Sequence, residues 1–108
     1  METSAITVGI IGGTGDLGTG LARRLARAGF RVIVGSRNER GAQGAAEALK
    51  NLGETSGWGA LQVSGASNPE AATAADLVFV TVPFSAHSAT LESIHEAFQG
   101  KVVVDVTV

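Results

Sequence analysis

A cluster of glycines near the N-terminus has the spacing of a phosphate-binding turn. Gly13, Gly15 and Gly18 match the pattern G-x-G-x-x-G, and Gly12 in front of them also satisfies a looser G-x-x-G-x-x-G spacing. Such glycines permit a tight turn, let a pyrophosphate approach the backbone and let a helix pack closely on a strand. The anion then lies on the free N–H groups at the positive end of that helix. A Walker-type phosphate loop is excluded because no Gly-Lys-Ser/Thr sequence follows.

A second group of residues indicates which dinucleotide is bound. In NAD-binding domains an Asp or Glu at the end of the second strand binds the ribose 2′-OH, but here that strand ends in Gly35-Ser36-Arg37. Ser36 can donate a hydroxyl hydrogen bond to a 2′-phosphate, and Arg37 and Arg40 can add charge-assisted contacts. The alternative is that both arginines decorate a solvated helix start, where cations oppose the helix dipole. The sequence therefore predicts NADP(H) rather than NAD(H).

Alternating apolar runs and helical patterns predict the elements that position these residues. Strands are expected over residues 6–11, 30–35, 60–63, 77–82 and 101–106. Helices are expected over residues 16–28, 38–52, 68–75 and 85–98. The order predicts an α/β fold, a doubly wound parallel sheet of the Rossmann type in three α/β/α layers, as one NADP-binding domain over residues 1–108.

The helix after the glycine turn has a regular apolar spacing. Leu17, Leu21 and Leu25 recur every four residues and predict its buried stripe. Gly29 is placed to end this helix with a left-handed cap.

The next two helices also carry boundary signals. Gly53 is expected to cap the second helix, and Asn68 is expected to cap the third, with Pro69 at its first helical position and Glu70 in its first turn. The expected inner face of the second helix consists of Ala42, Ala45, Ala46, Leu49 and Leu52.

The composition excludes several classes of function. The chain has 108 residues, no cysteine and a net charge of -2, with eight Lys and Arg against ten Asp and Glu. Nucleic-acid binders are usually basic, so we expect no nucleic-acid partner. No apolar run approaches the roughly 20 residues that cross a bilayer, and the N-terminus does not resemble a signal peptide. We expect no membrane partner, and a cysteine-free chain fits a reducing, cytoplasmic location.

The chain resembles the NADPH-dependent F-420 (8-hydroxy-5-deazaflavin) reductase family. The resemblance lies in Ile11–Ala22 (IGGTGDLGTGLA) and Val34–Arg37 (VGSR), and it extends through residues 80–84 and 102–105. It implies hydride transfer between NADP(H) and the deazaflavin coenzyme. It also implies that Thr14, Ser36, Arg37 and Arg40 hold the nucleotide, while the loop of Val82, Pro83 and Phe84 lies beside the nicotinamide.

The same resemblance bears on partners. The family carries a C-terminal helical domain that helps to form the deazaflavin pocket and the dimer, and this chain ends at Val108 without it. We therefore expect a further domain or a homodimer partner, with a small-molecule redox coenzyme as the ligand. NADP(H) and coenzyme F-420 are the expected cofactors.

The candidate set contains cofactor-binding residues but no catalytic side chain and no metal ligand, because hydride transfer needs two carbons held close rather than a general base. Asp16 is expected to cap the first helix and point away from the phosphates, with a direct role as a cofactor ligand as the alternative. His87 either touches a coenzyme or packs in a helix stripe. Two alternatives stay open: another NADP-dependent two-domain reductase with an imine, keto-acid or ferric-flavin acceptor, and a non-catalytic NADP(H) sensor. The full candidate set is Gly13, Thr14, Gly15, Asp16, Leu17, Ser36, Arg37, Arg40, Val82, Pro83, Phe84 and His87.

Overall fold

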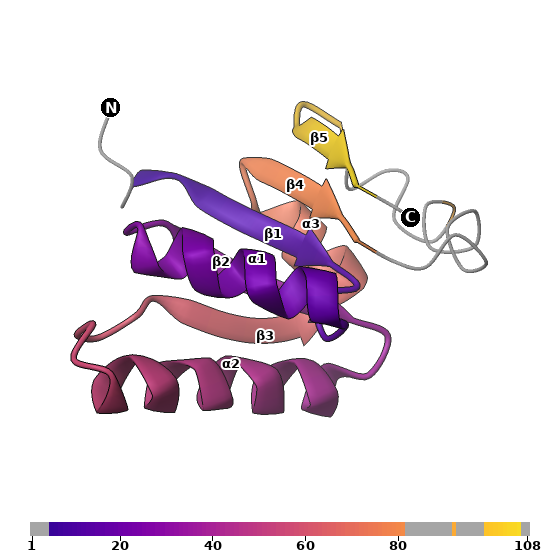
Figure 1. The fold of residues 1–108 in the computed structure, drawn as a ribbon. Coiled ribbons are helices and arrows are strands. Elements are labelled where there is room, and N and C mark those ends of the chain that lie inside the picture. Colours follow the sequence, from indigo (N-terminus) through magenta and orange to yellow (C-terminus); the bar gives the residue numbers. More distant parts are fainter. Residues whose placement is uncertain (1–4, 82–91, 93–98, 107–108) are drawn as a thin grey trace.

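A computed structural model of the chain describes residues 5–81, 92 and 99–106, and these form a parallel five-stranded sheet in the order β3-β2-β1-β4-β5 (Figure 1). The strands are β1 (Thr7–Ile11), β2 (Arg31–Ser36), β3 (Val63–Ser67), β4 (Leu77–Val80) and β5 (Val102–Asp105). The helices are α1 (Asp16–Arg27), α2 (Glu39–Thr55) and α3 (Asn68–Ala74). The predicted doubly wound α/β fold is confirmed.

The sheet is covered on both faces, which gives three layers. Val8 and Ile10 of β1 share one buried cluster with α1 and α2, whereas Ile11 lies in a second cluster with α3. Figure 1 shows α1 in front of the sheet and α3 behind it. Successive residues of a strand point to opposite faces, so a central strand covered on both sides is apolar at nearly every position.

The buried face of α1 differs from the predicted leucine stripe. Gly18, Ala22 and Ala26 are buried, while Leu17 is 44% exposed and Leu21 and Leu25 are only partly buried. The helix lies so close to the β1–α1 turn that a Cβ on Gly18 would stand 2.5 Å from the Cα of Gly13. Only small residues fit beneath it, and the leucines are displaced to its flank.

The C-terminal end of α1 is as predicted. Gly29 has φ 103° and donates its N–H to the carbonyl of Ala26 at 3.0 Å, while Phe30 donates to Leu25 at 3.1 Å. This pair of bonds is the Schellman motif, which a left-handed glycine makes accessible.

Helix α2 extends beyond its predicted end. Gly53 is not its cap but a buried residue within it, because a Cβ there would lie 2.9 Å from the Leu61 side chain. The helix ends instead at Thr55, before Gly57 with φ 76°. Of the predicted inner face, Ala42, Ala46 and Leu49 are buried, Ala45 is half-buried and Leu52 is 40% exposed.

Strand β3 lies further along the chain than predicted. It spans Val63–Ser67 rather than residues 60–63, and it pairs with β2 from Val32↔Val63 to Ser36↔Ser67. Its sequence VSGAS has a weak strand propensity of its own. Gly65 is the reason that this segment fits, because a Cβ there would overlap the backbone of Ala42 and Gln43 in α2.

The start of α3 is shifted by one residue from the prediction. Ser67, not Asn68, is the N-cap: its Oγ accepts from the Glu70 N–H at 3.3 Å and donates to the Glu70 carboxylate at 2.9 Å. The sequence has the S-x-x-E spacing of a capping box, but the Glu70 carboxylate accepts from the Ser67 hydroxyl instead of the Ser67 N–H. Asn68 becomes the first helical residue and is buried. None of the helices in the described ranges is long and apolar enough to cross a membrane.

Candidate functional site

The glycine turn between β1 and α1 is tightly packed at its start. Gly12 has φ 72°, and Gly13 donates its N–H to the carbonyl of Gly35 at 2.8 Å. A Cβ on Gly13 would lie 2.8 Å from the Val34 side chain and 2.9 Å from the Ile10 carbonyl oxygen. These glycines are therefore required by the turn and by its contact with β2, the roles that the motif predicts.

Gly15 has a different environment from its neighbours. A Cβ on this residue would meet only the Gly12 oxygen, at 3.9 Å, so packing within the chain does not require glycine here. Gly15 is the N-cap of α1 and makes no side-chain capping bond. Within the described part of the chain, the N–H groups of Asp16 and Leu17 have no hydrogen-bond partner. Open space in front of free helix N–H groups is the arrangement that accepts a phosphate.

The predicted capping role of Asp16 is wrong. Asp16 is the first residue of α1 rather than its cap, and its carboxylate bonds no N–H of the helix among the described residues. Its backbone oxygen accepts from the Thr19 hydroxyl at 3.3 Å. Thr14 and Leu17 flank the same turn, and both are exposed. The residues from Thr14 to Leu17 at the start of α1 are therefore accessible.

The end of β2 lies beside this turn, because the Gly35 carbonyl accepts the Gly13 N–H. Ser36 is half-buried there, and its Oγ accepts from the Asn38 N–H at 3.1 Å. Asn38 in turn caps α2 by accepting from the Gly41 N–H at 3.2 Å. The Ser36 hydroxyl proton is used by no described residue, so it is free to donate to an anion.

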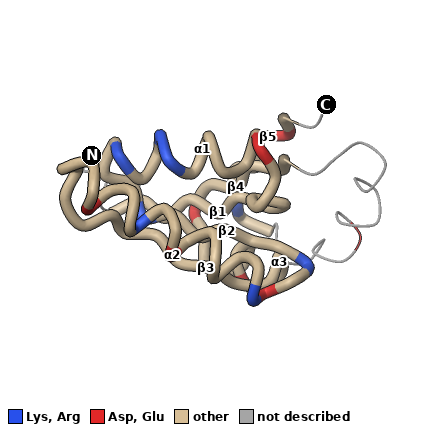
Figure 2. The backbone as a smooth tube through the Cα atoms, turned by 60° about the horizontal axis from the view of Figure 1, so that its bottom comes forward, with Lys and Arg blue, Asp and Glu red and all other residues tan. Residues whose placement is uncertain are grey.

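Two arginines lie at the corner where the end of β2 leads into α2. Arg37 and Arg40 are exposed, and neither guanidinium has an ion-pair partner in the regions that the structure describes. Figure 2 shows basic segments on either side of an acidic one where β2 leads into α2. Cations near a helix N-terminus are unfavourable for the dipole, which an anion between them would offset. The corner therefore fits a phosphate group.

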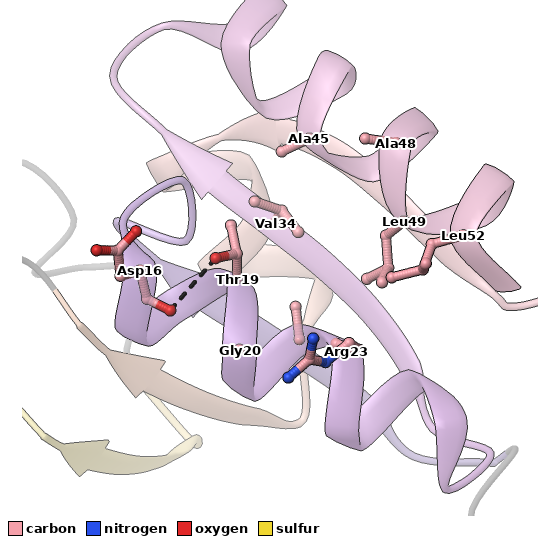
Figure 3. Close-up of a pocket in the computed structure, with 10 residues that line it drawn as sticks. Asp16, Thr19, Gly20, Arg23, Val34, Ala45, Ala48, Leu49 and Leu52 are labelled. Atoms are coloured by element: carbon pink, nitrogen blue, oxygen red, sulfur yellow. Dashed lines mark hydrogen bonds between the residues drawn. The ribbon is translucent and has the colours of Figure 1, made fainter. Parts of the chain in front are cut away.

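A groove of about 360 Å³ runs between α1 and α2 (Figure 3). Small and apolar side chains such as Val34, Ala45 and Leu49 line most of it, and Asp16 and Arg23 are its charged lining residues. Ser36, Arg37 and Arg40 do not line it. The groove is therefore distinct from the corner of Ser36, Arg37 and Arg40, but it reaches Asp16 at the start of α1.

Two buried polar residues that the sequence reasoning missed contact the glycine turn. Asn68 accepts the Gly12 N–H on its Oδ1 at 3.2 Å, and the Thr81 Oγ1 lies 3.1 Å from the Gly12 oxygen. Signals for both exist in the sequence. The S-x-x-E spacing of Ser67 and Glu70 moves the helix cap off Asn68, and Thr81 is a hydroxyl within an otherwise apolar run.

Part of the candidate set lies outside the described residues. Val82, Pro83, Phe84 and His87, predicted to lie on the nicotinamide side, belong to this part, as does most of the predicted helix over residues 85–98.

Comparisons with known proteins identify the family of this chain. The sequence model of the family described as NADP oxidoreductase, coenzyme F420-dependent, matches residues 7–108. An F420-dependent NADP reductase of Methanothermobacter marburgensis is 48% identical over 101 residues, which are 94% of this chain and 44% of the relative. The chain thus spans less than half the length of this curated relative.

Solved structures show the same fold. A putative F420-dependent NADP reductase of Arthrobacter sp. superposes with a TM-score of 0.72 at 24% identity, covering 94% of this chain and 44% of the other. A lactate dehydrogenase of Eimeria maxima, solved with NADH and oxamate, gives 0.78 at 16% identity over 94% of this chain and 36% of its own. The fold, the glycine turn and the family match lead to one assignment: the chain belongs to the family of coenzyme F420-dependent NADP oxidoreductases.

Proposed function

We propose that residues 1–108 form the NADP(H)-binding domain of an oxidoreductase that transfers a hydride between NADP(H) and coenzyme F420. The observation that carries the choice of NADP(H) is the corner at the end of β2. Among the described residues, it offers a hydroxyl proton on Ser36 that no residue uses and two guanidinium groups without an ion-pair partner, Arg37 and Arg40. It also has no acid where NAD-binding domains carry one.

Different residues of the chain would bind different parts of the nucleotide. The free N–H groups at the start of α1, with Thr14 beside them, would hold the pyrophosphate, and the open side of Gly15 leaves room for it. Ser36, Arg37 and Arg40 would hold the 2′-phosphate. The nicotinamide of the bound cofactor supplies the hydride chemistry, and we place it beside Val82, Pro83, Phe84 and His87.

The hydride partner is inferred from the family. The relatives in this family are named for coenzyme F420, and we infer that the same deazaflavin is the hydride partner here. The relative's chain is more than twice as long as this one, so we propose that further chain or a second subunit completes the deazaflavin side. We also propose a cytoplasmic location, which fits a chain without cysteine.

The first test is a calorimetric titration of the chain with NADPH and NADH, before and after Arg37→Glu. We expect NADPH to bind far more tightly than NADH, and the substitution to weaken NADPH on the order of 100-fold, because one charge-assisted bond is lost and a repulsion is added. NADH should change little. Arg24→Glu, an exposed reversal of equal charge in the last turn of α1, is the control. Equal losses for both dinucleotides would contradict the assignment.

The second test concerns the acceptor. Hydride transfer from NADPH is measured by absorbance with coenzyme F420, a flavin–iron system, an imine and a keto acid as acceptors. We expect slow turnover by the chain alone, with a preference for the deazaflavin. Robust turnover by the chain alone would contradict the need for a further domain, and a preference for another acceptor would contradict the proposed partner. Tight NADPH binding without transfer to any acceptor in the full-length gene product would favour a sensor.

A further inference from the structure

Gly12 is the residue at which the central strand β1 turns into the loop before α1. Its φ of 72° lies in the left-handed region, which gives its peptide groups an orientation that other residues rarely adopt. Both of its polar backbone groups are contacted by side chains from distant parts of the chain: the N–H by Asn68 and the carbonyl by Thr81. The conformation of the loop therefore depends on two residues outside the glycine motif.

Asn68 reaches Gly12 through the protein interior. Its side chain is only 3% exposed, and its Oδ1 accepts the Gly12 N–H at 3.2 Å. The path crosses the end of β2 at Gly35, where a Cβ would lie 2.9 Å from that oxygen. Asn68 is not needed to cap α3, because Ser67 already accepts from Glu70. Its hydrogen bond is thus directed at the loop rather than at its own helix.

Thr81 holds the other side of the same residue. It follows β4, the neighbour of β1 on the side away from β2, and is 9% exposed. Its Oγ1 lies 2.8 Å from the Ile11 oxygen and 3.1 Å from the Gly12 oxygen. Its backbone N–H also donates to Ile11 at 2.9 Å. One hydroxyl proton is therefore shared between the last carbonyl of β1 and the first carbonyl of the loop.

The backbone N–H groups at the two ends of the loop differ in whether they have a hydrogen-bond partner. The N–H groups of Gly12 and Gly13 are consumed by Asn68 and by the Gly35 carbonyl, whereas those of Asp16 and Leu17 have no partner among the residues described. We propose that Asn68 and Thr81 are positioning residues for the cofactor, which fix Gly12 from both sides so that the N–H groups at the start of α1 face the pyrophosphate. This inference rests on the proposed function.

The test compares four variants by calorimetry with NADPH and NADH and by amide hydrogen exchange at Gly12. Asn68→Leu keeps a similar volume but removes the acceptor. We expect it to weaken both dinucleotides by about tenfold, because the pyrophosphate is common to both and one hydrogen bond is lost. The Gly12 amide should exchange faster. Ser67→Ala removes the α3 cap instead, and we expect it to lower the Tm without either change.

The Thr81 side gives an independent measurement if Asn68→Leu does not fold. Thr81→Val keeps the shape but removes the hydroxyl, and it should weaken both dinucleotides, whereas Thr81→Ser keeps the hydroxyl and should restore binding. If Asn68→Leu folds and binds both dinucleotides with wild-type affinity, the positioning role alone is overturned. If Asn68→Leu does not fold, wild-type affinity of Thr81→Val has the same meaning. Failure of the wild-type chain to bind either dinucleotide would overturn the proposed function and, with it, this inference.

Discussion

The glycine turn and the β2–α2 corner are both candidate phosphate sites, but they are built in different ways. At the turn, the backbone of Gly12 and Gly13 is fixed by hydrogen bonds to Asn68, Thr81 and Gly35, and close packing leaves no room for a Cβ on Gly13. At the corner, Arg37 and Arg40 are exposed and unpaired in the described structure. Fixed amide dipoles require a rigid frame, whereas flexible side-chain cations bring their charge to the ligand.

This difference indicates which substitutions should change the fold together with binding and which should change binding alone. Substitutions in the packed part of the turn change the fold and the binding together. Substitutions at the corner, or on the open side of the turn, are expected to change binding while the fold stays intact.

The largest effect is expected from Gly18→Ala, which tests the packed part. Its Cβ would stand 2.5 Å from the Cα of Gly13 and 2.9 Å from its carbonyl carbon, both backbone atoms. Overpacking of this kind destabilises by about 1–3 kcal/mol, and the displaced turn should no longer bind NADPH. Chemical denaturation measures the first effect and calorimetry the second. Gly20→Ala in the same helix has no atom within 4 Å of its Cβ and should gain up to about 1 kcal/mol. Similar stabilities for the two variants would contradict the packing argument.

Gly15→Ala sharpens the comparison within the turn itself. The new Cβ meets only the Gly12 oxygen at 3.9 Å, and φ is -76°, so the free energy of unfolding should change by less than about 1 kcal/mol. The Cβ would nevertheless occupy the space that the pyrophosphate needs. We expect NADPH and NADH affinity to fall about 10- to 100-fold, as for the loss of one or two charge-assisted bonds. Binding at wild-type affinity would show that the dinucleotide does not approach Gly15.

Ser36→Ala tests the corner and should have the smallest effect. It removes the hydroxyl proton offered to the 2′-phosphate and the acceptor for the Asn38 N–H at 3.1 Å. A single hydrogen bond contributes about 1 kcal/mol, so NADPH affinity should fall about fivefold, with NADH unchanged and only a slight decrease in Tm. Ser36→Thr, which retains a hydroxyl, is the matched control. A loss that is equal for both dinucleotides would point to a distorted α2 start instead of a lost phosphate contact.

The sequence was sufficient to predict the architecture, and it also predicts the location of the candidate site. Buried strands such as Val32-Ile33-Val34 and the glycine spacing after β1 are local patterns. The position of Ser36 and Arg37 at the end of the second strand follows from the order of the strands alone. Parallel strands bring their carboxyl ends to one edge of the sheet, so residues after β1 and β2 had to meet there. The family resemblance added the coenzyme and agreed with the comparisons.

Two of the errors, the buried face of α1 and the position of β3, share one physical cause. The leucines of α1 have the higher hydrophobicity, but the distance between helix and sheet selected Gly18, Ala22 and Ala26 for the interface. The apolar residues before Val63 looked more like a strand than VSGAS did, but pairing with β2 and the approach of α2 at Gly65 selected the latter. Contacts between elements decided these positions, and such contacts leave no period in the sequence.

By itself, the sequence determined the fold class, and it predicts the phosphate-binding turn and the preference for a 2′-phosphate, because each depends on residue type and short-range spacing. Only the tertiary structure decided that Asn68 and Thr81 hold the turn in place. Their bonds to Gly12 connect residues 56 and 69 positions apart. A buried amide or hydroxyl must find a hydrogen-bond partner, but the identity of that partner is set by which backbone groups the assembled sheet brings within reach.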